Sequence, residues 1–151
     1  MIENINQEID NIDLSGLKEV ASRLAINRTA GDVITLAGPL GVGKTAFSKF
    51  YIQSVMGNFI EVPSPTFNIV QLYHPEYGPE IWHMDFFRLE KSQTYNHYND
   101  LDLNQAFQNC VSLIEWPDRL EKIIPLKRLD LKLDFINKDD ERRNLKISFH
   151  H

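Results

Sequence analysis

The sequence predicts an α/β fold in which helices cover both faces of a mixed β-sheet, giving three layers with a parallel core and antiparallel hairpins. Residues 33–37 form a nearly continuous apolar run, which suits a strand buried on both faces, and a glycine-rich loop connects this run to a helix-patterned segment. Residues 111–114 form a second run of this kind. Residues 129–149 contain two strictly alternating segments, which is the pattern of an antiparallel hairpin.

Length and composition predict one domain spanning residues 1–151. The chain has 42% hydrophobic and 25% charged residues, which is typical of a globular protein with an ordinary core. Cys110 is the one cysteine, so a disulfide scaffold is excluded and a reducing compartment is favoured. No apolar run approaches the roughly 20 residues of a membrane helix, and the first residues are acidic and polar. We therefore expect a cytoplasmic protein with no membrane partner.

The balance of charges argues against a dedicated nucleic-acid binder. Sixteen Lys and Arg residues against twenty-one Asp and Glu residues give a net charge of −5, whereas phosphate contacts need a concentrated positive field. The basic pairs at 127–128 and 142–143 have acidic residues nearby. We interpret these pairs as solvated strand and turn positions.

The N-terminal half is predicted to contain a helix, the apolar strand and a second helix. Over residues 14–25 the apolar side chains recur at three- and four-residue steps, and Asp13 or Ser15 is available as the N-cap. A second helix pattern begins at Lys44 and ends at Gly57, which suits a C-terminal cap.

The middle of the chain is predicted to contain a hairpin and a long loop. Residues 67–73 and 81–84 have strand patterns on either side of the stretch 74–79, which is dense in turn-forming residues. The hairpin ends at Asp85. Residues 90–102 are polar and poorly patterned, so we expect a loop or a mobile lid there.

The C-terminal third is predicted to contain a short helix, a buried strand and a hairpin. Residues 103–108 have a short helix pattern, residues 111–114 form the buried strand, and Pro117 suits a first helical turn. Apolar residues alternate over 129–135 and over 145–149, which predicts the antiparallel pair that closes the chain.

Residues 38–45, GPLGVGKT, match the pattern G-x-x-x-x-G-K-[ST] between a strand and a helix, which makes the predicted fold similar to P-loop NTPases. Glycines let successive backbone N–H groups converge on phosphate oxygens at the positive end of a helix dipole. Lys44 is expected to contact the β and γ phosphates, and the Thr45 hydroxyl to bind Mg²⁺. A glycine turn with an ordinary lysine is the alternative. The residues expected to contact the nucleotide are Gly38, Leu40, Gly41, Val42, Gly43, Lys44, Thr45 and Ala46.

Two apolar runs end in an acid, which suits nucleotide hydrolysis. Hydrolysis needs a carboxylate that holds the metal or its water at the carboxyl end of a neighbouring strand. Asp85 ends the run 81–85 and Glu115 ends the run 111–115. At each position the alternative is an acid that starts an exposed loop.

The loop after the P-loop helix offers a further candidate. Thr66, in the sequence SPTF at residues 64–67, lies where the first switch loop of ATPases and GTPases presents a hydroxyl to Mg²⁺ or to the γ-phosphate. A hydroxyl that caps a strand after Pro65 is an equally good interpretation.

Residues 137–140, NKDD, match the guanine-recognition pattern N-K-x-D, but we do not expect a GTPase. Only eleven residues follow Asp140, and their pattern is that of a strand, which leaves no room for the helix and second guanine loop of that fold. We interpret residues 137–140 as a hairpin turn, and we expect ATP and ADP as the nucleotides.

Four blocks of sequence occur in the order typical of one known family. They are GDVI leading into GPLGVGKT (31–45), SPTF (64–67), HMDFFR (83–88) and IEWP (114–117). Together they resemble the TsaE family (formerly YjeE), the small P-loop ATPases of bacterial tRNA threonylcarbamoyladenosine biosynthesis. HMDFFR is similar to the family's H-x-D-x-Y-R, and the resemblance extends from the first helix to Pro125.

The resemblance implies roles for individual residues. The implied catalytic residues are Lys44, Thr66, Asp85, Glu115 and Trp116. The implied metal ligands are Thr45, Asp85 and Glu115. The chain also departs from the family at two places: Phe87 stands where a Tyr is usual, which removes a hydroxyl, and residues 90–102 lack an expected glycine.

Three residues near the implied site keep two interpretations each. We interpret His83 as a hydrogen-bonded strand residue that orients Asp85, in preference to a proton donor. Arg88 can form a structural ion pair or contact the γ-phosphate or a partner. Trp116 can be a core aromatic residue or a functional one beside Glu115.

The resemblance implies an accessory ATPase. The family works with a heterodimer of two related subunits, of TsaB and TsaD type, one of which transfers a threonylcarbamoyl group to adenosine 37 of tRNA, and ATP hydrolysis sustains turnover. We expect tRNA to be contacted only through that complex. The alternatives are a small metabolite or nucleotide kinase and a binding module with negligible hydrolysis. A kinase lid is disfavoured because residues 90–102 contain one Lys and no Arg.

Overall fold

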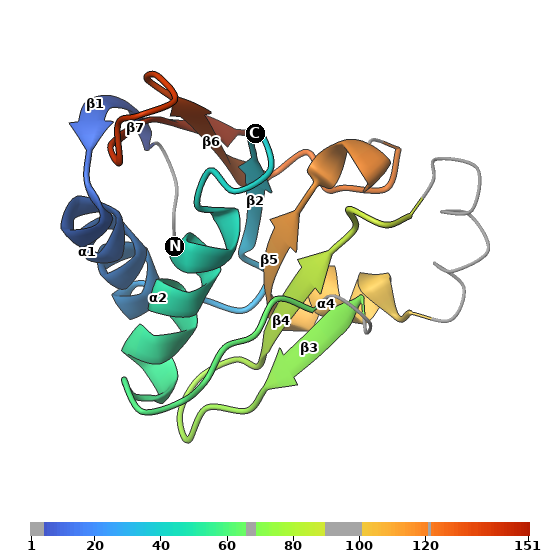
Figure 1. Cartoon of the computed structure of the whole chain (residues 1–151). Helices are drawn as coiled ribbons and strands as arrows, with labels where there is room; N and C mark the ends of the chain where they lie inside the picture. Colours follow the sequence, from blue (N-terminus) through green and yellow to red (C-terminus); the bar gives the residue numbers. More distant parts are fainter. Residues whose placement is uncertain (1–4, 66–68, 90–100, 121) are drawn as a thin grey trace.

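The computed structural model describes residues 5–65, 69–89, 101–120 and 122–151. Its centre is a seven-stranded sheet in the order β1-β7-β6-β2-β5-β4-β3 (Figure 1). The strands are β1 (Asn6–Ile12), β2 (Val33–Ala37), β3 (Val70–Tyr73), β4 (Ile81–Asp85), β5 (Val111–Glu115), β6 (Arg128–Phe135) and β7 (Arg143–His150). The described helices are α1 (Leu14–Ile26), α2 (Lys44–Met56), α4 (Leu103–Asn109) and the 3₁₀ helix η1 (Pro117–Leu120).

The sheet is mixed, as predicted. β2 pairs in parallel with β5 and β6, and β5 pairs in parallel with β4. The hairpins β3–β4 and β6–β7 are antiparallel. The carboxyl ends of β2, β4 and β5 consequently meet at one edge of the sheet, where Glu115 is in register with Asp85 on one side and with Leu36 on the other.

Helices cover both faces of the sheet, which confirms the three layers. α1 and α2 lie side by side on one face (Figure 1), over a large core in which alternate residues of β2, such as Ile34 and Leu36, are fully buried. On the opposite face α4 and η1 cover a smaller core that includes Val33, Met84 and Ile114. The strand β2 is therefore buried on both faces, as its continuous apolar run predicts.

The edge strand β1 was not predicted. It pairs antiparallel with β7, with Asn6 opposite Ser148 and Ile9 opposite Leu145, and the register shifts before Ile12. Its own pattern is uninformative because Ile12 is the one residue of the strand that is buried. Ile9 is partly buried against the same core, but so short a set of inward residues leaves the strand to be specified by its partner rather than by alternation of its own residues.

The other local predictions are confirmed where the structure describes them. The side chain of Asp13 caps α1 by accepting from the backbone N–H of Gly16 at 2.8 Å, and α2 ends at Gly57, which has φ of 110°. Of the predicted strand 67–73 the structure describes residues 69–73, and β3 begins at Val70 rather than at residue 69. Residues 66–68 and 90–100, which include Thr66 and most of the expected lid, lie outside the described residues. Among the helices described, none has the length and apolar character needed to cross a membrane.

Candidate functional site

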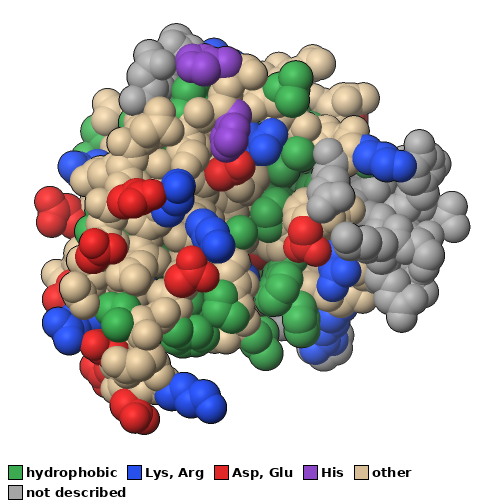
Figure 2. Space-filling view, turned by 90° about the horizontal axis from the view of Figure 1, so that it is seen from above, with side chains coloured by type: hydrophobic (Ala, Val, Ile, Leu, Met, Phe, Trp, Pro, Cys, Tyr) green, Lys and Arg blue, Asp and Glu red, His purple; other side chains and the backbone are tan. Residues whose placement is uncertain are grey.

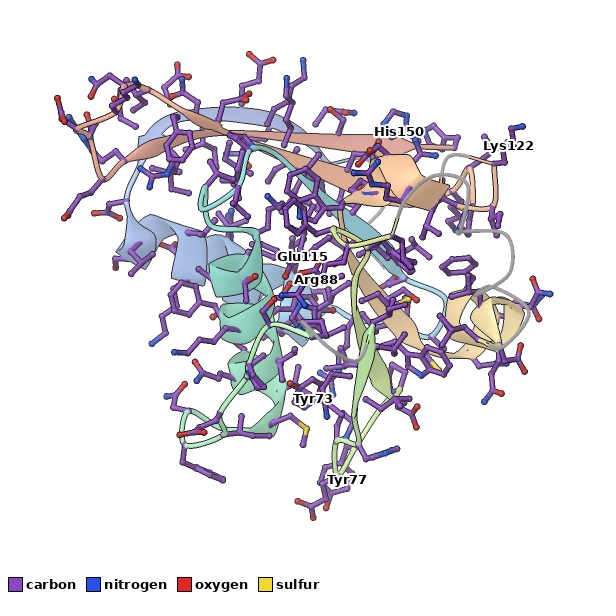
Figure 3. All side chains as sticks on the ribbon, turned by 45° about the vertical axis from the view of Figure 1, so that its right-hand side comes forward. Tyr73, Tyr77, Arg88, Glu115, Lys122 and His150 are labelled. Atoms are coloured by element: carbon purple, nitrogen blue, oxygen red, sulfur yellow. The ribbon has the colours of Figure 1, made fainter. Side chains whose placement is uncertain are left out.

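A cavity of about 420 Å³ opens where the carboxyl ends of β4 and β5 face the N-terminus of α2. Figure 3 shows Arg88 and Glu115 side by side in this region, beside α2. The predicted site residues that line the cavity are Leu40, Gly41, Gly43, Lys44, Thr45, Ala46, Asp85, Glu115 and Trp116. Ser64, Phe87 and Arg88 complete the lining. Gly38 and Val42 belong to the same loop but do not line the cavity, and Thr66 is outside the described residues.

The P-loop depends on glycine at its two ends. Gly38 has φ of 144°, and a Cβ atom at this position would lie 2.3 Å from the carbonyl oxygen of Leu133 on β6. No side chain fits there. Gly43 has φ of 122° and forms the N-cap of α2 without any side-chain capping bond, so the first N–H groups of the helix remain available to an anion.

Lys44 lies across the loop rather than extending into solvent. Its Nζ donates to the carbonyl oxygens of Gly38 at 2.7 Å and Pro39 at 2.9 Å, and lies 4.2 Å from the centre of the Trp116 ring. Burial lowers the pKa of Lys44, and the charges of Glu115 and Asp85 oppose that shift. A phosphate that enters the cavity would replace neutral carbonyls with charged oxygens, which are stronger acceptors for an ammonium group.

Glu115 is buried at the end of β5, and both of its oxygens have partners. Oε1 lies 2.8 Å from Nε2 of His83, and Oε2 accepts a hydrogen bond from the Thr45 hydroxyl at 2.9 Å. His83 therefore contacts Glu115, and the expectation that it orients Asp85 is wrong. The reason is the sheet register: Asp85 is opposite Glu115, so His83, two residues earlier on the same face, lies beneath the Glu115 side chain.

Asp85 is held by two different donors. Oδ1 accepts from the backbone N–H of Phe87 at 2.9 Å, and Oδ2 accepts from the Ser64 hydroxyl at 3.2 Å. Burial is the main cause that raises the pKa of Asp85; Glu115 adds to the shift, whereas these two hydrogen bonds and His83 oppose it. Ser64 was not predicted as a site residue, because the sequence showed only that it belongs to the SPTF block and gave no reason to pair its hydroxyl with Asp85.

Trp116 has a backbone conformation that is uncommon for a bulky residue. Its φ is 58°, in the left-handed region that costs a non-glycine residue about 1–2 kcal/mol. Its ring lies 4.8 Å from the ring of Phe87 and beneath the ammonium of Lys44. Trp116 packs against the smaller core and also lines the cavity, so the two interpretations of this residue are not exclusive. Such strained residues cluster at functional sites.

The oxygen donors of the cavity suit a hard cation whose remaining coordination positions are filled by a bound ligand and water. Thr45 offers a hydroxyl, and Asp85 and Glu115 offer carboxylates. Within the described ranges no three His, Cys, Asp or Glu side chains form a ready-made metal site. Mg²⁺ is the cation that matches this arrangement, since it keeps several waters and is usually bound through one or two carboxylates together with phosphate oxygens.

The guanine-like residues form a hairpin turn, as predicted. The side chain of Asn137 accepts from the backbone N–H of Asp139 at 3.1 Å, and the Asp140 carboxylate is paired with Arg142 at 2.9 Å. Arg142 lowers the pKa of Asp140 through this hydrogen bond. The carboxylate that a guanine base would need is thus already engaged in the turn.

Comparisons with known proteins agree with one another. Residues 12–145 match the sequence model of the family described as "Threonylcarbamoyl adenosine biosynthesis protein TsaE". The "tRNA threonylcarbamoyladenosine biosynthesis protein TsaE" of Bacillus subtilis is 36% identical over 126 residues, which cover 83% of this chain and 75% of the relative. The protein of the same name from Rickettsia bellii is 30% identical and covers 87% of both chains. The crystal structure of YdiB from Bacillus subtilis has the same fold, with a TM-score of 0.74 at 24% identity over 99% of this chain and 90% of that one.

Proposed function

The chain belongs to the TsaE family of tRNA threonylcarbamoyladenosine biosynthesis, and we propose that it acts there as a Mg²⁺-dependent ATPase subunit. In this role it binds and hydrolyses ATP in the cytoplasm, and its hydrolysis sustains turnover of the complex that transfers the threonylcarbamoyl group. Its partners are the two related subunits of TsaB and TsaD type.

The main support for this proposal is that positive and negative groups line the same cavity. Lys44 and the N-terminus of α2 supply the positive side, while Asp85 and Glu115 supply the negative side. A triphosphate bound to the loop would place its anionic oxygens against Lys44 and the helix dipole. Thr45, Asp85 and Glu115 would hold Mg²⁺, which neutralises charge that develops on the phosphate oxygens.

ATP is favoured over GTP because the carboxylate in the guanine-like turn, that of Asp140, is already engaged. Asp140 is paired with Arg142, and Asn137 bonds within its own turn. Guanine recognition would have to break these contacts before it could gain any of its own.

We propose that the isolated chain hydrolyses ATP slowly. Phosphoryl transfer needs fixed positive groups around the γ-phosphoryl oxygens in the transition state, but the cavity that would hold these oxygens is open to solvent. Docking on the two partner subunits would close the cavity and supply the missing order, so hydrolysis would be coupled to assembly.

We propose that the partner subunits, rather than this chain, contact the tRNA. Figure 2 shows basic and acidic side chains interspersed on the face seen from above rather than gathered into a basic patch. Several basic side chains on β6, β7 and their connection are paired with acids: Arg128 with Asp130, Lys132 with Asp134, Arg142 with Asp140 and Lys146 with Glu8. Paired charges of this kind create little of the long-range positive field that draws a protein to nucleic acid.

A nucleotide titration tests the binding part of the proposal. Calorimetric titrations with ATP, ADP and GTP, each with Mg²⁺ and with EDTA, should give tight binding of ATP and ADP and little affinity for GTP. Mg²⁺ should strengthen the binding of ATP. Equal affinities for ATP and GTP would contradict the nucleotide assignment, and the absence of any nucleotide binding would contradict the function as a whole.

A further inference from the structure

Arg143, the first residue of β7, is anchored against the back of the P-loop. Its Nε donates to the carbonyl oxygen of Val42 at 3.1 Å, and Nη1 donates to the carbonyl oxygens of Asp140 at 2.8 Å and Arg142 at 3.0 Å. The guanidinium carbon lies 4.6 Å from the centre of the Phe135 ring. Contacts on several sides hold the guanidinium in place, so the bond to Val42 is made by a group with little freedom to move.

This bond fixes the direction of one peptide unit in the P-loop. In a trans peptide the carbonyl oxygen and the following N–H point in opposite directions. The Val42 carbonyl points toward Arg143, which is not part of the cavity wall, whereas Gly43 lines the cavity. The N–H of Gly43 is therefore directed to the phosphate side. Among the described residues it donates to no acceptor, as expected of a group reserved for a ligand.

The Val42–Gly43 peptide needs such a restraint because glycine follows it. Glycine populates positive and negative φ with similar ease, so a peptide unit that precedes glycine can flip with little steric penalty. In the flipped state the Val42 carbonyl would point into the cavity, where its partial negative charge would repel a phosphate. The Val42 side chain is buried, which fixes the side chain but leaves the peptide plane to its hydrogen bonds.

We propose that Arg143 is a positioning residue that holds the Val42–Gly43 peptide in the orientation that binds phosphate. The C-terminal hairpin would thus be part of the nucleotide site without touching the nucleotide. This inference rests on the proposed nucleotide-binding function.

The test compares Arg143→Met with Arg142→Met. The first variant keeps an unbranched apolar side chain but removes the guanidinium, and with it the bonds to the carbonyl oxygens of Val42, Asp140 and Arg142. The second removes the neighbouring arginine, whose side chain pairs with Asp140 and makes no bond to the loop. Arg143→Met should weaken the binding of ATP and ADP about tenfold and by the same factor, because the P-loop loses its charge-assisted hydrogen bond at the Val42 carbonyl. Arg142→Met should bind both nucleotides like the parent chain.

A spectroscopic measurement separates positioning from general structural damage. In the parent chain the amide proton resonance of Gly43 should move downfield when ADP binds, because its N–H then donates to a phosphate. In Arg143→Met this movement should be lost or greatly reduced at saturating ADP, while the amides of β4 and β5 keep their positions. If Arg143→Met does not fold, Arg143→Lys serves instead, and it should retain part of the affinity because one donor remains.

The results distinguish a failure of the role proposed for Arg143 from a failure of the proposed function. Unchanged affinity in the Arg143 variant, or a Gly43 amide that moves as in the parent chain, would overturn the inference while leaving the proposed function intact. Equal losses in the Arg142 and Arg143 variants would also overturn it, because the effect would then belong to the hairpin as a whole. A parent chain that binds neither ATP nor ADP would instead refute the proposed function.

Discussion

The Nε2 atom of His83 lies 2.8 Å from Oε1 of Glu115, and both side chains are almost completely excluded from solvent. Since the other Glu115 oxygen accepts from the Thr45 hydroxyl, one carboxylate connects the middle of β4 and the end of β5 to the first turn of α2. The distance between the P-loop and the acidic strand ends is thereby set by hydrogen bonds as well as by apolar packing.

Replacement of His83 by Phe should destabilise the fold. The ring volume is retained, but a buried carboxylate oxygen loses its partner, which costs about 1–3 kcal/mol. Urea unfolding followed by circular dichroism should show this loss in the free energy of unfolding. His83→Gln, which keeps an amide donor, should lose less. A Phe variant as stable as the parent chain would show that His83 does not support Glu115.

Replacement of Lys44 by Ala should abolish productive nucleotide binding without unfolding the protein. The phosphates lose their point-charge partner, so ATP affinity should fall by about a hundredfold or more. The free protein should keep its melting temperature, because the unfavourable burial that lowers the pKa of Lys44 offsets the hydrogen bonds that its ammonium group donates. Lys49, an exposed residue of the same helix, provides the control: Lys49→Ala should bind ATP normally.

Replacement of Asp85 by Asn should stabilise the free protein at neutral pH. Burial raises the pKa of this carboxyl above its ordinary value of 3.8, so ionisation is less favourable in the folded state than in the unfolded state. The destabilisation develops as the pH rises from the pKa of Asp85 in the unfolded state to its higher pKa in the folded state. It persists at all higher pH values. Asn avoids it and should raise the melting temperature at pH 7 by about 1–3 °C, given the solvent screening at this half-buried position.

Two further measurements check the role of Asp85. The stabilisation should shrink as pH falls through the folded pKa and vanish only well below 3.8, the ordinary pKa, where the aspartate is protonated in both states. The same variant should bind ATP with a much weaker dependence on Mg²⁺ while it retains some affinity for the nucleotide. An Asn variant that hydrolyses ATP normally at limiting Mg²⁺ would mean that Asp85 is only a loop acid.

Glu115→Ala and Trp116→Ala should reduce turnover far more than they reduce ATP affinity. Both residues line the cavity, and Trp116 lies beneath the ammonium group of Lys44. We therefore expect their contribution chiefly in the transition state. Phosphate release in the presence of the partner subunits should fall at least tenfold, whereas the dissociation constant for ATP should change only a few-fold. A loss confined to ATP affinity would contradict a catalytic role for either residue.

Much of the fold and the outline of the site follow from local sequence patterns. The buried strand β2, the glycine loop and α2 are specified by residues close together in the chain, and the acids that end β4 and β5 were found because both runs stop in a carboxylate. Parallel pairing then brings those acids to the same edge. These features are predictable because short-range patterns encode them.

The contacts that complete the site have no local pattern. His83 bonds to a residue 32 positions away, and Arg143 bonds to one 101 positions away, so neither contact can be inferred from spacing along the chain. The strand β1 was missed for a related reason, since its pairing with β7 joins the two ends of the sequence. Ser64 escaped notice because a hydroxyl in a proline-flanked loop has many uses besides a bond to Asp85.

We propose that this chain hydrolyses ATP effectively only when it is assembled with its partners. The most direct test measures phosphate release from saturating Mg²⁺-ATP by the isolated chain and by the chain mixed with the two subunits of TsaB and TsaD type, with Lys44→Ala as the blank. We expect slow release by the chain alone and stimulation of at least tenfold on mixing. Rapid hydrolysis by the isolated chain that the partner subunits leave unchanged would contradict this proposal.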